Sequence, residues 1–140
     1  MDKKTSMPTV AEVDELVAFL PQLDSEGFVA IKSWGGGDKN PDGSVNVLWP
    51  VYDEIVAKFF RTASKECWCD FSYGAHDVPA KLQREGFIEN ADLAQLKTLL
   101  TFCVRGERFC DGHWGGMIEC GYIQRILQQL RVFGSQLSTG

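Results

Sequence analysis

The chain has 140 residues, a length typical of one globular domain. Hydrophobic residues make up 44% and charged residues 24%, ordinary proportions for a folded protein, so disorder along the whole chain is disfavoured. The net charge of −5 disfavours nucleic acid as the main partner, because an acidic protein repels phosphate groups.

Hydropathy and cysteine content indicate the compartment. No apolar run approaches the roughly 18 residues that a membrane span needs, so we expect no membrane association. The opening Met1-Asp2-Lys3-Lys4 is followed by no apolar run of the kind found in signal peptides. The five cysteines are an odd number, which favours free thiols over a disulfide framework. Because thiols stay reduced in the cytosol, we expect a cytoplasmic protein, and nothing in the sequence calls for a cofactor.

The first predicted elements are a mobile tail over residues 1–8 and an amphipathic helix. Thr9 and Glu12 fit a capping box at the start of this helix. Apolar residues then recur at helical spacing, at Val13, Leu16, Val17 and Leu20. Pro21 is expected to end the helix, because the residue before a proline avoids the helical region.

Two extended runs follow, Phe28–Trp34 and Val45–Trp49. Between them lies the glycine-rich stretch Gly35–Gly43, which predicts a long, flexible loop. Together these segments predict one short β-hairpin near residues 28–49, although the loop is longer than most hairpin loops.

Helical patterns occupy most of the remaining chain. We expect caps at Asp53, Asp77, Asn90 and Asp111, and helix ends near Gly86, Gly106 and Gly121. The last helix is predicted over residues 122–133, followed by a frayed tail over 134–140. The stretch Cys67–Tyr73 is assigned to neither strand nor loop. The fold class is therefore mainly α: a compact single domain over residues 9–133, of five or six helices with one short hairpin.

A cluster of charged residues lies at a predicted helix junction, and it supplies the candidate ligand-binding residues Arg105, Glu107, Arg108, His113 and Glu119. Arginine suits carboxylate or phosphate, and histidine titrates near neutral pH. A functional interpretation makes His113 and Glu119 acid/base candidates, with Asp70 or His76 brought in from upstream. The structural alternative, which we favour, is that the charges pair with one another and fix how two helices meet.

Cysteines and one histidine offer a second, weaker hypothesis. Cys67, Cys69, Cys110 and His113 are soft ligands that could form a tetrahedral zinc site if their loops meet. The pair Cys67 and Cys69 is separated by one residue, whereas two to four are usual in zinc sites. Cytosolic cysteine is also often a small buried hydrophobe, so we assign no metal.

Aromatic residues form the third group. The candidate partner-binding residues are Trp34, Trp49, Trp68, Asp70 and Tyr73. Tryptophan and tyrosine are enriched at binding surfaces, yet the same residues could fill the core between the hairpin and the helices.

The C-terminal part of the chain resembles a known family. The resemblance is carried by Leu99-Leu100-Thr101, Arg105-Gly-Glu107-Arg108-Phe109, Gly112-His113, Met117-Ile118-Glu119 and the apolar spacing from Ile123 to Leu130. This pattern, best over residues 90–131, resembles a bacterial domain-of-unknown-function family, number 6508. The resemblance implies no activity, substrate or cofactor.

Two main functional hypotheses follow. The first is a non-enzymatic protein-binding or regulatory module, in the neighbourhood of a mobile element or phage, with a protein partner or a second copy of itself. The second is an enzyme or small-ligand binder centred on Arg105, Arg108, His113 and Glu119. A structural zinc domain is the third. We favour the first, because the chain is acidic, rich in aromatic residues and without a recognisable catalytic set.

Overall fold

The computed structural model describes residues 8–45, 49–70, 78–108 and 112–139. The α-helices of these residues are α1 (Val10–Val17), α2 (Leu20–Leu23), α3 (Glu54–Ala63), α4 (Val78–Gln83), α5 (Leu93–Arg105), α6 (His113–Glu119) and α7 (Tyr122–Thr139). The short 3-10 turns are η2 (Glu66–Trp68), η3 (Ile88–Asn90) and η4 (Gly106–Arg108), and the strands are β1 (Ile31–Gly35) and β2 (Trp49–Tyr52). The predicted fold class, a single mainly α domain with one hairpin, is confirmed.

The N-terminal helix begins as predicted. The Thr9 side chain accepts from the Glu12 N–H at 3.2 Å, and the Glu12 carboxylate accepts from the Thr9 N–H at 2.8 Å. The predicted end of this helix is wrong: α1 stops at Val17, and Pro21 lies in the first turn of the separate helix α2. Proline is tolerated there because the first N–H groups of a helix have no partner within it. The sequence therefore predicted as one helix what the structure forms as two.

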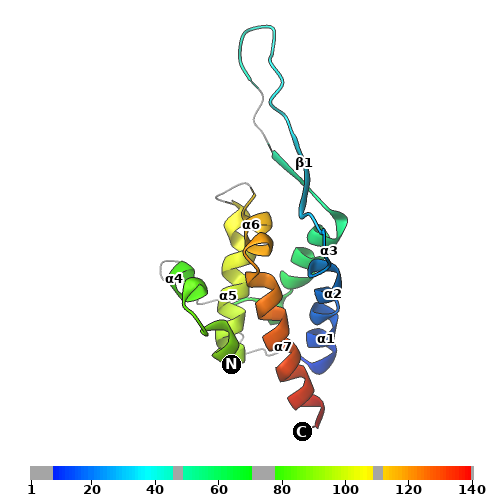
Figure 1. Ribbon diagram of the computed structural model, residues 1–140, viewed down its shortest axis with the longest axis vertical. Coiled ribbons are helices and arrows are strands. Elements are labelled where there is room, and N and C mark those ends of the chain that lie inside the picture. Colours follow the sequence, from blue (N-terminus) through cyan, green and yellow to red (C-terminus); the bar gives the residue numbers. More distant parts are fainter. Residues whose placement is uncertain (1–7, 46–48, 71–77, 109–111, 140) are drawn as a thin grey trace.

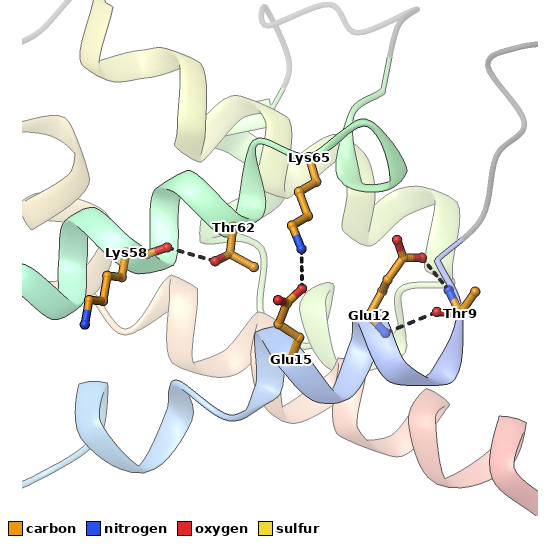
Figure 2. A network of polar contacts seen from close by, with 6 residues as sticks. All are labelled: Thr9, Glu12, Glu15, Lys58, Thr62 and Lys65. Atoms are coloured by element: carbon orange, nitrogen blue, oxygen red, sulfur yellow. Dashed lines mark hydrogen bonds and ion pairs between the residues drawn. The ribbon is translucent and has the colours of Figure 1, made fainter.

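A polar contact joins α1 to the end of α3. Lys65 Nζ lies 2.6 Å from the Glu15 carboxylate, beside the capping box of Thr9 and Glu12 (Figure 2). In the same view, the Thr62 hydroxyl donates to the Lys58 carbonyl one turn earlier in α3. Both partners of the ion pair are about half exposed, so we expect it to orient the two helices more than it stabilises them.

Helix α7 is the centre of the helical body and packs against α1, α2, α5, α6 and η3 (Figure 1). Its inward face is fully buried, at Ile123, Ile126, Leu127 and Leu130. Helix α5 contributes the facing layer through Leu96, Leu99 and Leu100. Each of these side chains contributes about 1.5–3 kcal/mol by its removal from water. The helix continues to Thr139, past Phe133, where the sequence predicted its end.

Of the four predicted aspartate and asparagine caps, one is confirmed, one is wrong, and two lie outside the described residues. Asp53 caps α3 by accepting from the Ile55 N–H. The predicted cap Asn90 instead ends η3 and donates to the Gly86 carbonyl at 2.7 Å. The N-cap of α5 is Asp92, which forms a capping box with Gln95. Asp77 and Asp111 lie outside the described residues, and α6 starts from Gly112 in the left-handed conformation.

The hairpin projects from one end of the helical body as an arm, which we define as residues 31–52 (Figure 1). Its strands pair antiparallel, with Trp34 opposite Pro50 and a bulge between Ile31 and Ser33. The glycine-rich stretch predicted as a flexible loop contains an ordered turn, in which the Asn40 N–H donates to the Ser44 carbonyl at 2.7 Å. No helix within the described ranges is long and apolar enough to cross a bilayer.

Candidate functional site

The arm meets the helical body at Glu107, which lies in η4 immediately after α5. Its Oε1 accepts from the Tyr52 hydroxyl and from the Trp114 N–H, both at 2.8 Å. Its Oε2 accepts from the Gly112 N–H at 3.0 Å. One carboxylate thus ties the end of β2 to the first N–H groups of α6, which have no partner within the helix.

Aromatic rings surround this carboxylate. The Trp114 ring stacks on Phe60 with the centroids 4.5 Å apart, and it lies 5.3 Å from the Tyr52 ring. The indole Nε1 of Trp114 donates to the Val104 carbonyl at 3.0 Å. Burial, together with the hydrogen bond to Glu107, raises the pKa of Tyr52, so its hydroxyl stays protonated as a donor. We call Tyr52, Glu107, Gly112 and Trp114 the junction cluster.

His113 packs beside the junction cluster, between Phe102 and Gly106. Its ring meets the edge of Phe102 at 5.2 Å, and a Cβ atom placed on Gly106 would overlap the imidazole. Its Nε2 is buried and has no hydrogen-bond partner among the described residues. Burial lowers the pKa of His113 against the opposing effect of Glu107, so the ring is neutral at pH 7. This environment is that of a packed side chain.

Glu119 lies at the other end of α6 from His113, about 9 Å further along the helix axis. The structure therefore does not bring these two acid/base candidates together. Arg105 ends α5 and lines a small pocket of about 130 Å³ with Cys69 and Thr101. The side chain of Arg108 lies outside the described residues. Among the predicted ligand-binding residues, Glu107 and His113 share one junction, and Glu119 faces a different surface.

That surface contains a pocket of about 430 Å³. It lies between the loop that follows α2, the start of β1 and the connection from α6 to α7. Its floor includes Phe28 and Ile118, and Asp24 and Glu119 supply two exposed carboxylates. None of the residues that line it is a lysine or an arginine.

The predicted partner-binding residues divide between surface and core. Trp34 and Trp49 are 50% and 52% exposed on the arm. Trp68 is fully buried, so it belongs to the core and not to a partner surface. Asp70 holds the chain against α5, because its N–H donates to Thr101 and its carboxylate accepts from Thr98. Tyr73 and His76 lie outside the described residues.

The candidate metal ligands lie in different surroundings. Cys67 is buried, and burial together with a hydrogen bond to Glu12 raises the pKa of its thiol to about 11. Cys69 donates to the Ser64 carbonyl at 3.7 Å. Cys110 lies outside the described residues, and no group of three potential metal ligands occurs among the described ones. The zinc hypothesis thus gains no support from the placed residues.

Several residues at these sites were not found from the sequence. Asp24, Gln124 and Val29 line the pocket, and Val51 is 40% exposed on the arm. Aromatic and β-branched residues at Trp49, Val51 and Tyr52 favour a strand, and the two-residue period of a strand would have placed Val51 on the same face as Trp49. No local signal joins Asp24 to Glu119, because only the tertiary fold brings the two together.

These features define a small helical domain that carries a projecting β-hairpin. A family model described as a family of unknown function (DUF6508) matches residues 8–136, and the chain belongs to this family. No match was found among the curated proteins or among the solved structures.

Proposed function

We propose that this protein is a protein-binding module and that the arm is its binding surface. The observation that supports this most strongly is the exposure of large apolar side chains on the arm. Trp34, Val45, Trp49 and Val51 are each between 40% and 58% exposed. Contiguous exposed apolar side chains often mark interaction sites. Tryptophan is also enriched among the residues that dominate binding energies.

The charge distribution supports the same function. The arm carries two lysines and two aspartates, Lys32, Lys39, Asp38 and Asp42, and is therefore neutral. The net charge of −5 accordingly lies on the rest of the chain. Because the arm has no net charge, it adds no long-range repulsion towards a partner surface of either sign of charge.

Cross-strand geometry gives the arm two distinct faces. The face with Ile31, Trp34 and Tyr52 turns towards α6: Ile31 reaches Gly115, and Trp34 reaches Gly112. The opposite face carries Val51 and Trp49, and the Trp49 indole lies across Gly35. We expect this outer face, which points away from α6, to make the main contact with a partner.

The test compares an outer-face variant with a matched control on the body. Trp49→Ser with Val51→Thr removes the apolar side chains from the outer face, whereas Val132→Ser removes an equally exposed apolar side chain from α7. Proteins enriched from cells of the source organism on the wild-type chain are purified, and their dissociation constants are measured by calorimetry. We expect the arm variant to weaken binding at least about tenfold, a loss of ~1.4 kcal/mol, and the control to leave it unchanged.

Equal binding by the wild type and the arm variant would contradict the proposal. Circular dichroism and urea unfolding of both variants accompany the binding measurement. The control should change the free energy of unfolding by less than about 0.5 kcal/mol. The arm variant should lower it by about 1 kcal/mol, because the Trp49 indole also packs across Gly35 on the neighbouring strand.

A further inference from the structure

The two strands of the arm differ at their open edges. The Asp53 N–H donates to the Ala30 carbonyl at 2.9 Å, which fixes which residues of each strand face the other strand. By alternation, Tyr52 and Pro50 direct their main-chain groups away from β1. Pro50 has no N–H, so the outer edge of β2 lacks a donor there, an arrangement that protects edge strands from added strands.

The outer edge of β1 contains no proline. Ile31 and Trp34 direct their main-chain groups away from β2, and both retain the N–H and the carbonyl. Within the described ranges, no other segment forms a hydrogen bond with these groups. An open edge of this kind can accept an extended segment of another chain as a third strand.

The edge of β1 leads directly to the pocket. Val29, Ala30 and Ile31 line the pocket and also form the approach to β1 and its first residue. A strand added about 4.8 Å from β1 would therefore reach the pocket at one of its ends. The half-exposed Trp34 lies further along the same strand.

The pocket offers hydrogen-bond acceptors and negative charge. Asp24 and Glu119 are exposed carboxylates at its rim. The Gln124 amide donates to the Ile118 carbonyl at 3.0 Å and to the Leu23 carbonyl at 3.4 Å, so its donors are already used inside the protein. With no basic residue lining it, the pocket suits a lysine or arginine side chain.

We infer that the partner bound by the arm contributes an extended segment that adds to the outer edge of β1 and places a lysine or arginine in the pocket. This inference rests on the proposed protein-binding function and specifies the chemistry of the partner. A second copy of this chain fits less well, because it would bring a further charge of −5 towards the two carboxylates.

The test uses a library of random twelve-residue peptides, selected on the immobilised full chain. The strongest peptide is synthesised, and its dissociation constant is measured for the wild type and for the double variant Asp24→Lys with Glu119→Lys. Glu66→Lys with Glu85→Lys is the control, because it makes the same charge change at exposed positions that do not line the pocket. We expect selected peptides to carry lysine or arginine near one end. The pocket variant should weaken binding at least tenfold more than the control does.

Strand addition is tested on the peptide itself. Two versions are N-methylated at alternate residues, in complementary sets, so that each version removes one edge of N–H groups. We expect one set to bind like the parent peptide and the other to bind at least tenfold more weakly, because only one edge of an added strand faces β1.

The outcomes separate the two proposals. One possible result is that Trp49→Ser with Val51→Thr abolishes binding, while the pocket variant and both methylated peptides leave it unchanged. This result would support the protein-binding function and overturn strand addition. Self-association of the wild type that blocks peptide binding would overturn the basic segment in favour of a second copy. If selection on the wild type enriches no peptide relative to selection on the pocket variant, the proposal of a basic segment is likewise overturned.

Discussion

The carboxylate of Glu107 satisfies donors from two segments that are distant from one another in sequence. It accepts from Tyr52 in the arm and from the N–H groups of Gly112 and Trp114. Hydrogen bonds to a charged acceptor contribute about 1.5–3 kcal/mol, and removing one partner leaves the others unsatisfied in a partly buried place. Glu107 is therefore the side chain on which the position of the arm depends most.

Replacing Glu107 with glutamine keeps its size but removes the charge and places an NH₂ group where one acceptor oxygen was. We expect Glu107→Gln to lower the free energy of unfolding by about 1–3 kcal/mol, measured by urea denaturation. Tyr52→Phe removes the hydrogen bond to Glu107 and the longer one, of 3.4 Å, from the Gly115 N–H, and should cost about 1–2 kcal/mol. Glu119→Gln, at an exposed position, serves as the control. Equal stability of the Glu107 and Glu119 variants would contradict the role of the junction cluster.

His113 gives stability a dependence on pH. In the unfolded chain the imidazole binds a proton as the pH falls through about 6.5, whereas burial lowers the pKa of the folded ring. The unfolded state then binds more protons, so the free energy of unfolding should fall as the pH drops below about 6.5. His113→Gln should remove this slope between pH 7 and pH 5, as followed by urea midpoints. The carboxylates whose pKa is lowered, Glu12, Asp42 and Glu89, act in a more acidic range. An unchanged slope in the variant would contradict the assignment.

At the scale of the elements, α6 is short and contains two adjacent glycines with different surroundings. A Cβ atom on Gly115 would lie 2.8 Å from the Ile31 Cδ1, whereas one on Gly116 would meet nothing within 4 Å. The close approach of β1 to α6 therefore depends on Gly115 and not on its neighbour. This contrast offers a matched pair of substitutions within one helix.

We expect Gly116→Ala to stabilise the protein by about 0.5–1 kcal/mol, because alanine has the higher helix propensity. Gly115→Ala gains the same propensity but pushes Ile31 away, so it should be destabilising by about 1–3 kcal/mol relative to Gly116→Ala. Thermal unfolding of the two variants measures the difference. If both substitutions stabilise equally, the arm does not pack on α6 as described.

The sequence predicted the elements better than their junctions. Local chemistry was sufficient for the Thr9 and Asp53 caps, for the helical periodicity of α5 and α7, and for the existence of the hairpin. It failed where two candidates competed within a few residues: Asn90 has the side chain of a cap, but Asp92 is followed three residues later by Gln95. Pro21 was treated as a helix end, although proline also suits the first turn of a helix.

The candidate ligand-binding residues remain predictions. The structure places Glu107 at the junction of α5 and α6, where the hydrogen bonds described for its carboxylate reach Tyr52 and main-chain N–H groups and not the predicted charged partners. The pocket could not be predicted, because it forms between residues that are roughly a hundred positions apart, such as Leu23 and Gln124. Exposure of Trp34 and Trp49, against burial of Trp68, likewise depends on packing that a single sequence does not reveal.

At the scale of the whole molecule, a packed helical body carries an arm with few buried contacts. The body is held by fully buried residues of α5 and α7, such as Leu100 and Leu127. A two-stranded hairpin is marginal by itself, so the arm depends on its base for order. We expect amide hydrogen exchange to show two levels of protection: the Leu127 amide exchanging through global unfolding, and the Val51 amide exchanging on the order of a hundredfold faster. Equal protection of both amides would contradict this division.

The attachment of the arm at one end has a mechanical consequence. The junction cluster lies at the base of the projecting arm (Figure 1), and the Asn40–Ser44 turn lies within the part that projects. We therefore expect the arm to move as a lever with its pivot at Glu107. A rotation of a few degrees at the pivot moves the tip much further than the base. Changes in the short segment between α5 and α6 can therefore steer where the tip reaches, without any change in the arm itself.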